Sequence, residues 1–309
     1  MFFYNTEKDR QMEIFRKMSF ADSTGDAIPF YHEGKYHIFS LTSPPGTTVY
    51  PERLRTTWSH SISDDLVHWQ ELPTALYPGE GDEPDASGVW TGSVIYGEGQ
   101  YHAFYTGYCL TAEFQQTICH ATSDDGITWT KDIANPVITP MTELYEKLDW
   151  RDPYVFYNEE DENYWILISA RRLDMPVTRR GCIVLYRSKN LKDWTYYGPI
   201  YSPGHTNCPE CPEMYKMGGH WYLSYSRFSE FVNTIYRVSE SPFGPWRKPK
   251  KDGIGGRRFY AAKSMQNDDG RRFYLDGRMI VQSRVTKVNG IGVEHFVFHM
   301  KWCQPKMES

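Results

Sequence analysis

Three acids, Asp26, Asp152 and Glu210, each stand just before a short apolar segment that is typical of a β-strand. The segments are "AIPFY", "PYVFY" and "CPEMYK". The start of a strand holds a side chain rigidly while leaving it open to a ligand. Carboxylates that share a pocket raise a neighbour's pKa, so that near neutral pH one is ionised and another is a proton donor. Such a pair suits glycoside hydrolysis, which needs an acid for the leaving oxygen and a carboxylate for the anomeric carbon or its water.

For these acids to meet, equivalent strands must surround one axis, and the sequence contains a repeat that predicts this. Five segments begin with a polar or turn-forming residue and continue with Tyr, Trp or Phe and alternating apolar positions. Their first aromatic residues lie roughly 50–65 residues apart, which is typical of propeller blades. The segments are "GKYHIFSL" (34–41), "GQYHAFYTGY" (99–108), "ENYWILISA" (162–170), "GHWYLSYS" (219–226) and "GRRFYLDG" (270–277).

A second motif, in which a serine ends a strand and a tryptophan follows a polar turn, occurs after four of these segments. The serine and the tryptophan are six residues apart in three copies and seven in the fourth, and we expect the tryptophans to pack between blades. The copies are "SISDDLVHW" (61–69), "ATSDDGITW" (121–129), "YRSKNLKDW" (186–194) and "RVSESPFGPW" (237–246).

The two motifs together predict an all-β fold, a five-bladed β-propeller whose active site lies at the central channel. A β-sandwich is the competing fold, but it has no reason to repeat a Ser-turn-Trp motif at blade spacing. We expect one domain over residues 1–309, with no C-terminal β-sandwich. The blades should cover roughly residues 20–75, 88–135, 150–200, 207–250 and 257–303, with an N-terminal strand or the tail "VEHFVFHMKW" completing the last sheet.

Other residues near the starts of the inner strands suit a sugar, which buries its C–H faces on aromatic rings and offers hydroxyls to polar groups. We expect these residues to bind substrate: Trp58, Trp90, Thr91, Ser93, Arg151, Tyr260 and Lys263.

Composition narrows the class of partner. The formal net charge is −5, and basic residues form only short clusters such as "RKPKK" (247–251), so a nucleic-acid partner is not expected. No window approaches the ~18 apolar residues of a membrane span, and the N-terminus lacks the pattern of a signal peptide, which favours a cytoplasmic location. The sequence does not predict an oligomeric state.

The cysteines do not predict a metal site. Cys208 and Cys211 form a C-x-x-C pair, but no second pair or paired histidines complete the four ligands of a tetrahedral zinc site. We therefore expect reduced thiols, no metal and no cofactor.

Several motifs, in order along the chain, resemble those of glycoside hydrolase family 32, the family of invertases, inulinases and levanases. They are "GDAIPFYHEGKYHIFSL" (25–41), "WSHSISDDLVHW" (58–69), "RDP" (151–153), "EC" (210–211) and "FYAAKS" (259–264). Singly, "RDP" and "EC" are weak signals, whereas the ordered set at blade spacing is specific.

The resemblance implies a role for each acid. Asp26 would be the nucleophile that attacks the anomeric carbon, and Asp152 would stabilise the oxocarbenium-like transition state. Glu210 would be the general acid and then the base that activates water. The expected activity is that of a retaining exo-β-fructofuranosidase, which releases fructose from a small carbohydrate such as sucrose or a short fructan.

Some alternatives stay open. The family's Asn before the nucleophile and Pro-Asn-Gly after it are absent, and Asp22 lies close enough in sequence to be the nucleophile if the first motif is shifted. The related five-bladed families contain arabinofuranosidases and xylosidases, often inverting. A propeller that binds carbohydrate without catalysis is the alternative from a different class.

Overall fold

In the part of the chain that the structure describes, the regular elements are β-strands and two short 3-10 helices, η1 (Glu52–Leu54) and η2 (Val177–Arg179). The computed structural model describes residues 24–276, apart from 48, 229–230 and 256–258, and the backbone of short strands within 11–15, 286–288, 291–293 and 297–302. Over these residues, the structure contains no helix of the length and apolarity needed to cross a membrane. The all-β prediction is confirmed.

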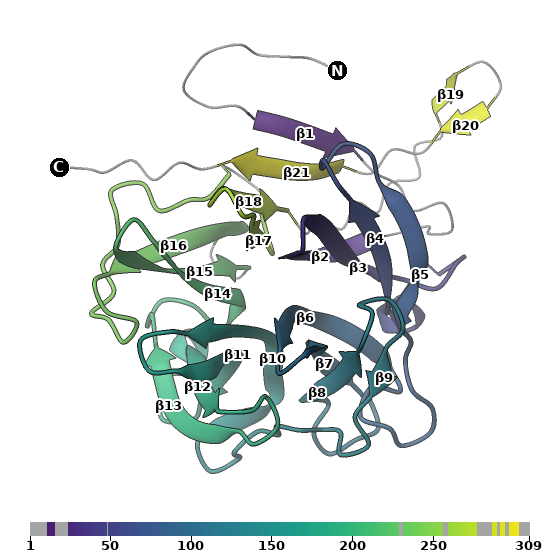
Figure 1. The fold of residues 1–309 in the computed structure, drawn as a ribbon. Helices are drawn as coiled ribbons and strands as arrows, with labels where there is room; N and C mark the ends of the chain where they lie inside the picture. Colours follow the sequence, from purple (N-terminus) through teal and green to yellow (C-terminus); the bar gives the residue numbers. More distant parts are fainter. Residues whose placement is uncertain are drawn as a thin grey trace.

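Four antiparallel sheets, each built from strands consecutive in sequence, surround a common centre, and their first strands lie innermost (Figure 1). This arrangement confirms that the fold is all-β and propeller-like. The first sheet comprises β2 (Thr24–His32), β3 (Lys35–Thr42), β4 (Thr57–Ser63) and β5 (Gln70–Leu76); the second β6 (Gly88–Gly97), β7 (Gln100–Tyr108), β8 (Gln116–Ser123) and β9 (Thr130–Lys131); the third β10 (Tyr145–Asn158), β11 (Asn163–Arg172), β12 (Gly181–Ser188) and β13 (Thr195–Tyr201); the fourth β14 (Pro209–Met217), β15 (His220–Arg227) and β16 (Asn233–Ser239).

A further sheet combines strands from both ends of the chain. Its order is β17 (Lys263–Gln266), β18 (Arg272–Leu275), β21 (Val297–Trp302) and β1 (Gln11–Phe15), so the N-terminal strand lies outermost. The strand β17 contacts both β2 and β14. Two more strands, β19 (Thr286–Val288) and β20 (Ile291–Val293), pair only with each other. The five aromatic segments of the sequence correspond to β3, β7, β11, β15 and β18, as predicted.

The Ser-turn-Trp motif forms a hydrogen-bonded turn that reverses the chain between strands. In the second sheet the Ser123 hydroxyl accepts a hydrogen bond from the backbone N–H of Gly126 (2.9 Å). The Asp125 carboxylate accepts from the backbone N–H groups of Ile127 (2.8 Å) and Thr128 (2.7 Å). These short polar side chains satisfy the backbone groups that a tight turn leaves unpaired.

The tryptophans of this motif pack against the neighbouring sheet. Trp129 meets Phe39 of the first sheet edge to face, with ring centroids 5.9 Å apart, and Trp194 meets Phe104 of the second sheet at 5.3 Å. Trp69 and Trp246 pack against two further buried clusters. The predicted packing of these residues between sheets is confirmed.

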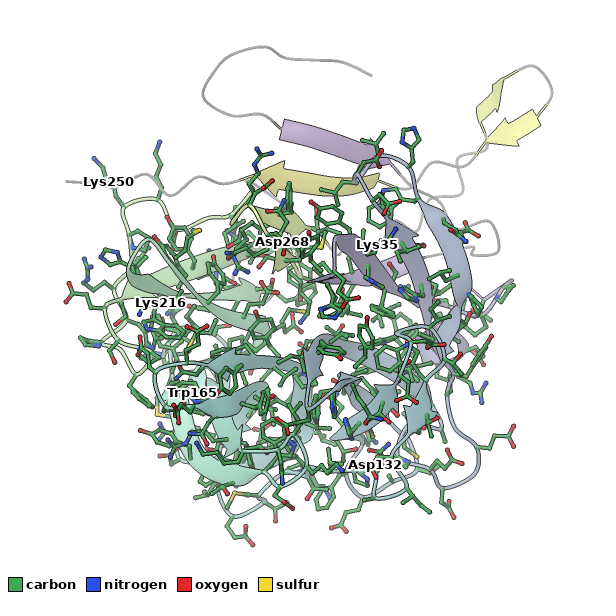
Figure 2. The ribbon with its side chains drawn as sticks, viewed as in Figure 1. Lys35, Asp132, Trp165, Lys216, Lys250 and Asp268 are labelled. Carbon is green, nitrogen blue, oxygen red and sulfur yellow. The ribbon has the colours of Figure 1, made fainter. Side chains whose placement is uncertain are left out.

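The core lies mainly between adjacent sheets. Trp165, labelled in Figure 2, is fully buried between the third and fourth sheets with Met214 and Leu223, whereas Lys250 lies exposed at the outer margin. Apolar burial of this kind holds each inner strand at a fixed distance from the next.

Replacing Ser123 by alanine should lower the free energy of unfolding by about 1–2 kcal/mol, because it leaves the buried N–H of Gly126 without an acceptor. Urea denaturation of the two proteins would measure this. The matched control is Ser202→Ala, which removes an exposed hydroxyl and should change the stability by less than about 0.5 kcal/mol. Equal effects of the two substitutions would contradict the role assigned to the turn.

Candidate active site

Each of the inner strands β2, β6, β10 and β14 contains a β-bulge. The register shifts between Thr24 and Ala27 in β2, between Val89 and Gly92 in β6, between Arg151 and Tyr154 in β10 and between Glu210 and Glu213 in β14. A bulge bends the strand and redirects one side chain. As a result, the side chains that the bulges redirect come together at one end of the inner strands.

The strand pairing shows which bulge residues are equivalent. Tyr31, Tyr96, Tyr157 and Lys216 each pair with the first aromatic residue of the next strand. Counting back five residues from these four positions gives Asp26, Thr91, Asp152 and Cys211, respectively.

The prediction that the three acids occupy equivalent positions is therefore wrong for Glu210. This residue corresponds to Arg151, and Cys211 corresponds to Asp152. The sequence contained the signal, because Asp152 and Cys211 are each followed by proline. The acids still come together, because Glu210 approaches from the position next to the bulge residue of its own strand.

The bulge residues have a left-handed backbone in two of these strands. The φ angle is 57° at Asp152 and 48° at Cys211, and it is 50° at Ala261, just before β17. For residues other than glycine this region costs roughly 1–2 kcal/mol. Such strain persists only where surrounding contacts enforce it, which is typical of functional sites.

Hydroxyl groups of the second strands supply those contacts. The Thr106 hydroxyl donates to the carbonyl of Thr91 (2.9 Å) and accepts from the backbone N–H of Asp152 (2.8 Å). The equivalent Ser226 hydroxyl accepts from the backbone N–H of Ala261 (2.9 Å). Each of these hydroxyls lies on one sheet and fixes the bulge of the next.

Asp26, Asp152 and Cys211 meet at the centre. The Sγ atom of Cys211 lies 3.8 Å from an oxygen of each carboxylate, and its backbone N–H donates to Oδ2 of Asp152 (3.0 Å). The Thr91 hydroxyl donates to Oδ2 of Asp26. Asp26, Thr91, Asp152 and Cys211 come from four different sheets and thus form one cluster around two carboxylates.

Asp26 has the properties of a carboxylate held in an unfavourable environment. Its pKa is raised to about 7, chiefly by burial and in addition by the nearby charges of Asp152 and Glu210. The hydrogen bond from Thr91 and the charge of Lys263 oppose this rise. Asp26 therefore changes its charge near neutral pH, as a catalytic carboxylate can.

Glu210 is held through one of its two oxygens. Its Oε1 accepts a hydrogen bond from Arg151 (2.8 Å), while its buried Oε2 makes no hydrogen bond to any described residue. Burial raises the pKa of Glu210, Arg151 lowers it and Asp152 raises it. A carboxyl group with a raised pKa and one oxygen free of protein contacts can donate a proton to a ligand.

A chain of alternating charges runs outward from Glu210. Arg151 pairs with Asp149 (2.5 Å), which pairs with Arg171 (2.9 Å). Arg171 pairs with Glu146 (3.0 Å), which also pairs with Arg180. Because these side chains are largely buried, their charges act on one another more strongly than surface pairs would.

The residues predicted to bind substrate have different surroundings in the structure. Thr91 and Arg151 belong to the acid cluster. Trp90 is partly buried, stacks on Tyr108 at 4.0 Å and donates to the carbonyl of Leu54 (3.0 Å). Tyr260 is partly buried next to Ala261, with its ring 6.2 Å from that of Phe228.

The predicted roles of Trp58, Ser93 and Lys263 need correction. Trp58 is fully buried in the core and donates to the carbonyl of Trp90 (2.9 Å), so it supports Trp90 and does not face a ligand. Ser93 and Lys263 line a cavity deeper along the axis. Asp22, the alternative nucleophile, lies outside the described residues.

Cys211, Asp149 and Thr106 are part of the site but were missed from the sequence. Aligning "DP" with "CP" would have found Cys211. Asp149 and Thr106 act through side-chain contacts to distant residues, for which the sequence contains no signal. Among the described residues, no group of three or more His, Cys, Asp and Glu side chains is placed to hold a metal ion.

Comparison with known proteins agrees with the motifs in the sequence. The model of the glycosyl hydrolases family 32 N-terminal domain matches residues 26–289. The chain is 27% identical over 269 residues to a sucrose-6-phosphate hydrolase of Zymomonas mobilis subsp. mobilis, covering 79% of this chain and 50% of the relative. It is 30% identical over 270 residues to a raffinose invertase of Escherichia coli, covering 79% and 52% respectively.

A solved structure has the same fold. A variant of fructan 1-exohydrolase IIa from Cichorium intybus, in complex with 1-kestose, aligns with a TM-score of 0.72 and 22% identity. The alignment covers 94% of this chain and 57% of that one. The chain spans about half the length of the curated relatives it matches.

Replacing Asp26 by asparagine should stabilise the protein at high pH. The pKa of Asp26 is about 7 in the folded chain against 3.8 for the ordinary group, so the folded state loses stability as Asp26 ionises and pH rises through 7. Asparagine does not ionise. The gain in unfolding free energy at pH 8 should exceed that at pH 4.5 by about 2–4 kcal/mol, measured by urea denaturation.

The control is Asp125→Asn. The pKa of Asp125 is lowered to about 2 by backbone hydrogen bonds from Thr128 and Ile127, so its charged form is favoured in the folded state and this substitution should not stabilise at pH 8. A pH-independent effect of Asp26→Asn would show that Asp26 has an ordinary pKa.

Proposed function

The chain belongs to glycosyl hydrolase family 32, and we propose that it is a retaining exo-β-fructofuranosidase that releases fructose from sucrose or short fructans. The observation that carries the proposal is the cluster in which Asp26 and Glu210 both have raised pKa values beside Asp152. The names of the relatives, a sucrose-6-phosphate hydrolase and a raffinose invertase, support this substrate class.

In the first step, a carboxylate oxygen of Asp26 attacks the anomeric carbon of the fructosyl unit. The bond from that carbon to the leaving oxygen breaks, and Glu210 gives its proton to this oxygen. The product of the step is a fructosyl ester of Asp26. The Thr91 hydroxyl, which donates to Asp26, favours the ionised form that the attack requires.

In the second step, Glu210 accepts a proton from a water molecule, whose oxygen attacks the same carbon. The ester bond breaks, Asp26 is released as a carboxylate, and Glu210 is protonated again. Two displacements at one carbon retain its configuration.

Asp152 stabilises the charge that develops on the sugar ring in both steps. Its carboxylate is buried and is held by the backbone N–H of Cys211 and by the bulge of β10, so it does not need to reorganise during the reaction. We assign Trp90, Arg151 and Tyr260 to substrate binding around the acids, because they are partly exposed at this end of the inner strands.

We also propose that the sheet β17–β18–β21–β1 is a fifth blade that closes the ring, so that residues 1–309 form one five-bladed propeller domain with its active site at the central channel. Contacts with the first sheet support this. The Tyr31 hydroxyl donates to Asp268 (2.7 Å), and the side-chain amide of Asn267 donates to the Tyr36 hydroxyl (3.1 Å). Both Asn267 and Asp268 lie on the turn between β17 and β18.

Closure can be tested with paired cysteines. Glu13 of β1 pairs with His299 of β21, and residues paired directly across two antiparallel strands lie close enough for a disulfide. The double variant Glu13→Cys/His299→Cys should form this bond on mild oxidation, detected by peptide mass spectrometry. The out-of-register control is Glu13→Cys/Val297→Cys. Equal yields in both variants would contradict the pairing that closes the ring.

Hydrolysis can be measured on sucrose, sucrose 6-phosphate, 1-kestose, inulin and levan. Aryl arabinofuranosides and xylosides serve as the alternative substrates. Asp26→Asn and Glu210→Gln should each lower kcat/KM on the fructosides by about 10³-fold or more. Product analysis by chromatography measures this, and NMR of the first-formed anomer should show retention.

The control for this assay is Glu160→Gln, which removes an exposed acid that pairs with Lys216 and should keep full activity. Fructose release that is unaffected by both active-site substitutions would reject the assignment. Turnover of the arabinofuranosides alone would favour the related pentosidases, and saturable binding without turnover would favour a carbohydrate-binding propeller.

Asp149 provides a test of the charge chain. Its carboxylate forms an ion pair with Arg151, and its negative charge raises the pKa of Glu210. Asp149→Asn should therefore lower the pKa of Glu210, so that the general acid loses its proton at a lower pH. The basic limb of the profile of kcat/KM against pH should move to lower pH, and Asp149→Glu should restore it. A limb that stays in place or moves upward would contradict this role.

A further inference from the structure

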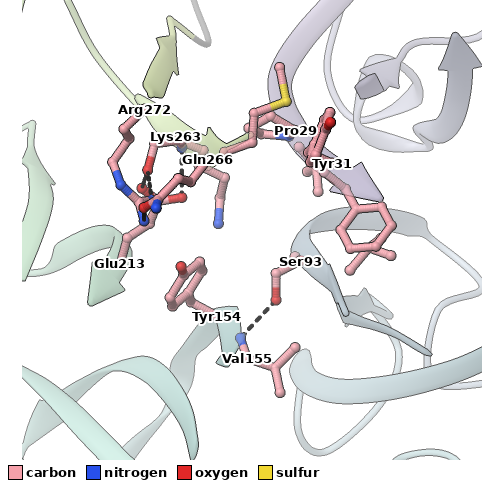
Figure 3. Close-up of a pocket in the computed structure, with 15 residues that line it drawn as sticks. Pro29, Tyr31, Ser93, Tyr154, Val155, Glu213, Lys263, Gln266 and Arg272 are labelled. Carbon is pink, nitrogen blue, oxygen red and sulfur yellow. Dashed lines mark hydrogen bonds between the residues drawn. The ribbon is translucent and has the colours of Figure 1, made fainter. Parts of the chain in front are cut away.

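A second site lies deeper along the same axis. A cavity of about 160 Å³ is lined by the residues that follow the bulges along the inner strands, including Ser93, Tyr154 and Glu213, and by Lys263 and Arg272 of the neighbouring sheet. Figure 3 shows Lys263, Glu213 and Arg272 on one side of this space, across from Ser93 and Val155. The mechanism proposed above uses none of these side chains.

Lys263 has an ammonium group in this cavity without a partner. The residue is 1% exposed, and its Nζ makes no hydrogen bond to any described residue. The ammonium group lies over the ring of Tyr154, whose centroid is 5.8 Å from Nζ. An ammonium group removed from water without a counter-ion is strongly unfavourable, so an acceptor is expected beside it.

Glu213, the carboxylate of this cavity, does not fill that role. Its two oxygens accept hydrogen bonds from the backbone N–H and the hydroxyl of Ser264, both at 2.8 Å. Burial raises the pKa of Glu213, although Lys263 lowers it. The carboxylate is therefore directed toward Ser264 and away from an ion pair with Lys263.

The remaining polar groups of the lining add donors. Arg272 donates from Nη1 to the Ser264 hydroxyl (2.9 Å) and from Nη2 to the side-chain oxygen Oε1 of Gln266 (3.0 Å). Its buried Nε has no hydrogen-bond partner among the described residues. The Ser93 hydroxyl accepts from the backbone N–H of Val155 (2.9 Å), which leaves its hydrogen to donate elsewhere. Donors thus outnumber acceptors around the cavity.

We propose that this cavity binds a small monovalent anion of the chloride type, held by Lys263. A water molecule could accept one of these hydrogen bonds, whereas an anion would also bring a counter-charge into direct contact with Nζ. The carboxylates of Glu213 and Asp26 act on Lys263 without a hydrogen bond to it. The cavity has room for an anion together with part of its hydration. A single negative charge matches the one unpartnered ammonium group, whereas a larger charge would be repelled by Asp26, Asp152 and Glu210 nearby on the axis.

The first test is the thermal stability of the full chain at constant ionic strength while sodium chloride replaces sodium gluconate, whose anion is too large for the cavity. The Tm of the wild-type protein should rise with the chloride concentration, by about 2–4 °C in total, and should level off once the site is saturated. The Tm of Lys263→Met should not respond. The matched control, Lys216→Met, removes an exposed lysine and should respond as the wild type does.

The second test does not depend on the folding of a variant. Crystals of the wild-type protein soaked in sodium bromide should show an anomalous peak beside Lys263 Nζ. An axial cavity that contains only water in such crystals would overturn the proposal, as would an equal rise in Tm for wild type and Lys263→Met. Neither test uses a sugar, so their outcome is separate from that of the proposed hydrolase activity.

Discussion

The burial of three carboxylates close to one another is the unfavourable arrangement that the inner strands have to maintain. Burial is the largest cause that raises the pKa of both Asp26 and Glu210, and each of these acids is also raised by the charge of Asp152. A flexible chain would separate such groups and hydrate them. The sheets prevent this separation, because apolar side chains packed between neighbouring sheets hold the inner strands at fixed distances.

The bulges in these rigidly held strands bring the side chains of the site together. A regular strand alternates its side chains between two faces, whereas a bulge turns an additional residue toward the axis. The left-handed backbone of Asp152 and Cys211 is unfavourable in isolation and is maintained by hydrogen bonds such as that from Asp152 N–H to Thr106. The packing of the sheets therefore keeps three acids close together at a cost in stability. Replacing Asp26, for example, is expected to stabilise the fold while removing its chemistry.

The strands and tryptophans that recur in several sheets could be predicted from the sequence, whereas the position of a residue within a single strand could not. The aromatic strands and the tryptophans such as Trp129 and Trp194 were predictable, because a repeated motif has the same contacts in every copy. Trp58 was misassigned because its motif does not show which side of the strand faces the core. The position of Glu210 was mistaken for that of Cys211 because the one-residue offset depends on strand register. Asp149 pairs with Arg151 of its own strand and with Arg171 of the adjacent strand β11, and no sequence pattern indicates that these charges meet.

Carbon-13 NMR of the aspartate carboxyl groups, recorded against pH for the free protein, tests the central claim most directly. One aspartate signal should titrate with a midpoint near 7, should vanish in Asp26→Asn and should move to higher pH in Thr91→Val, because that variant lacks the hydrogen bond that favours the ionised form. Spectra in which every aspartate titrates near its ordinary value of about 4 would show that the acids do not share a buried site.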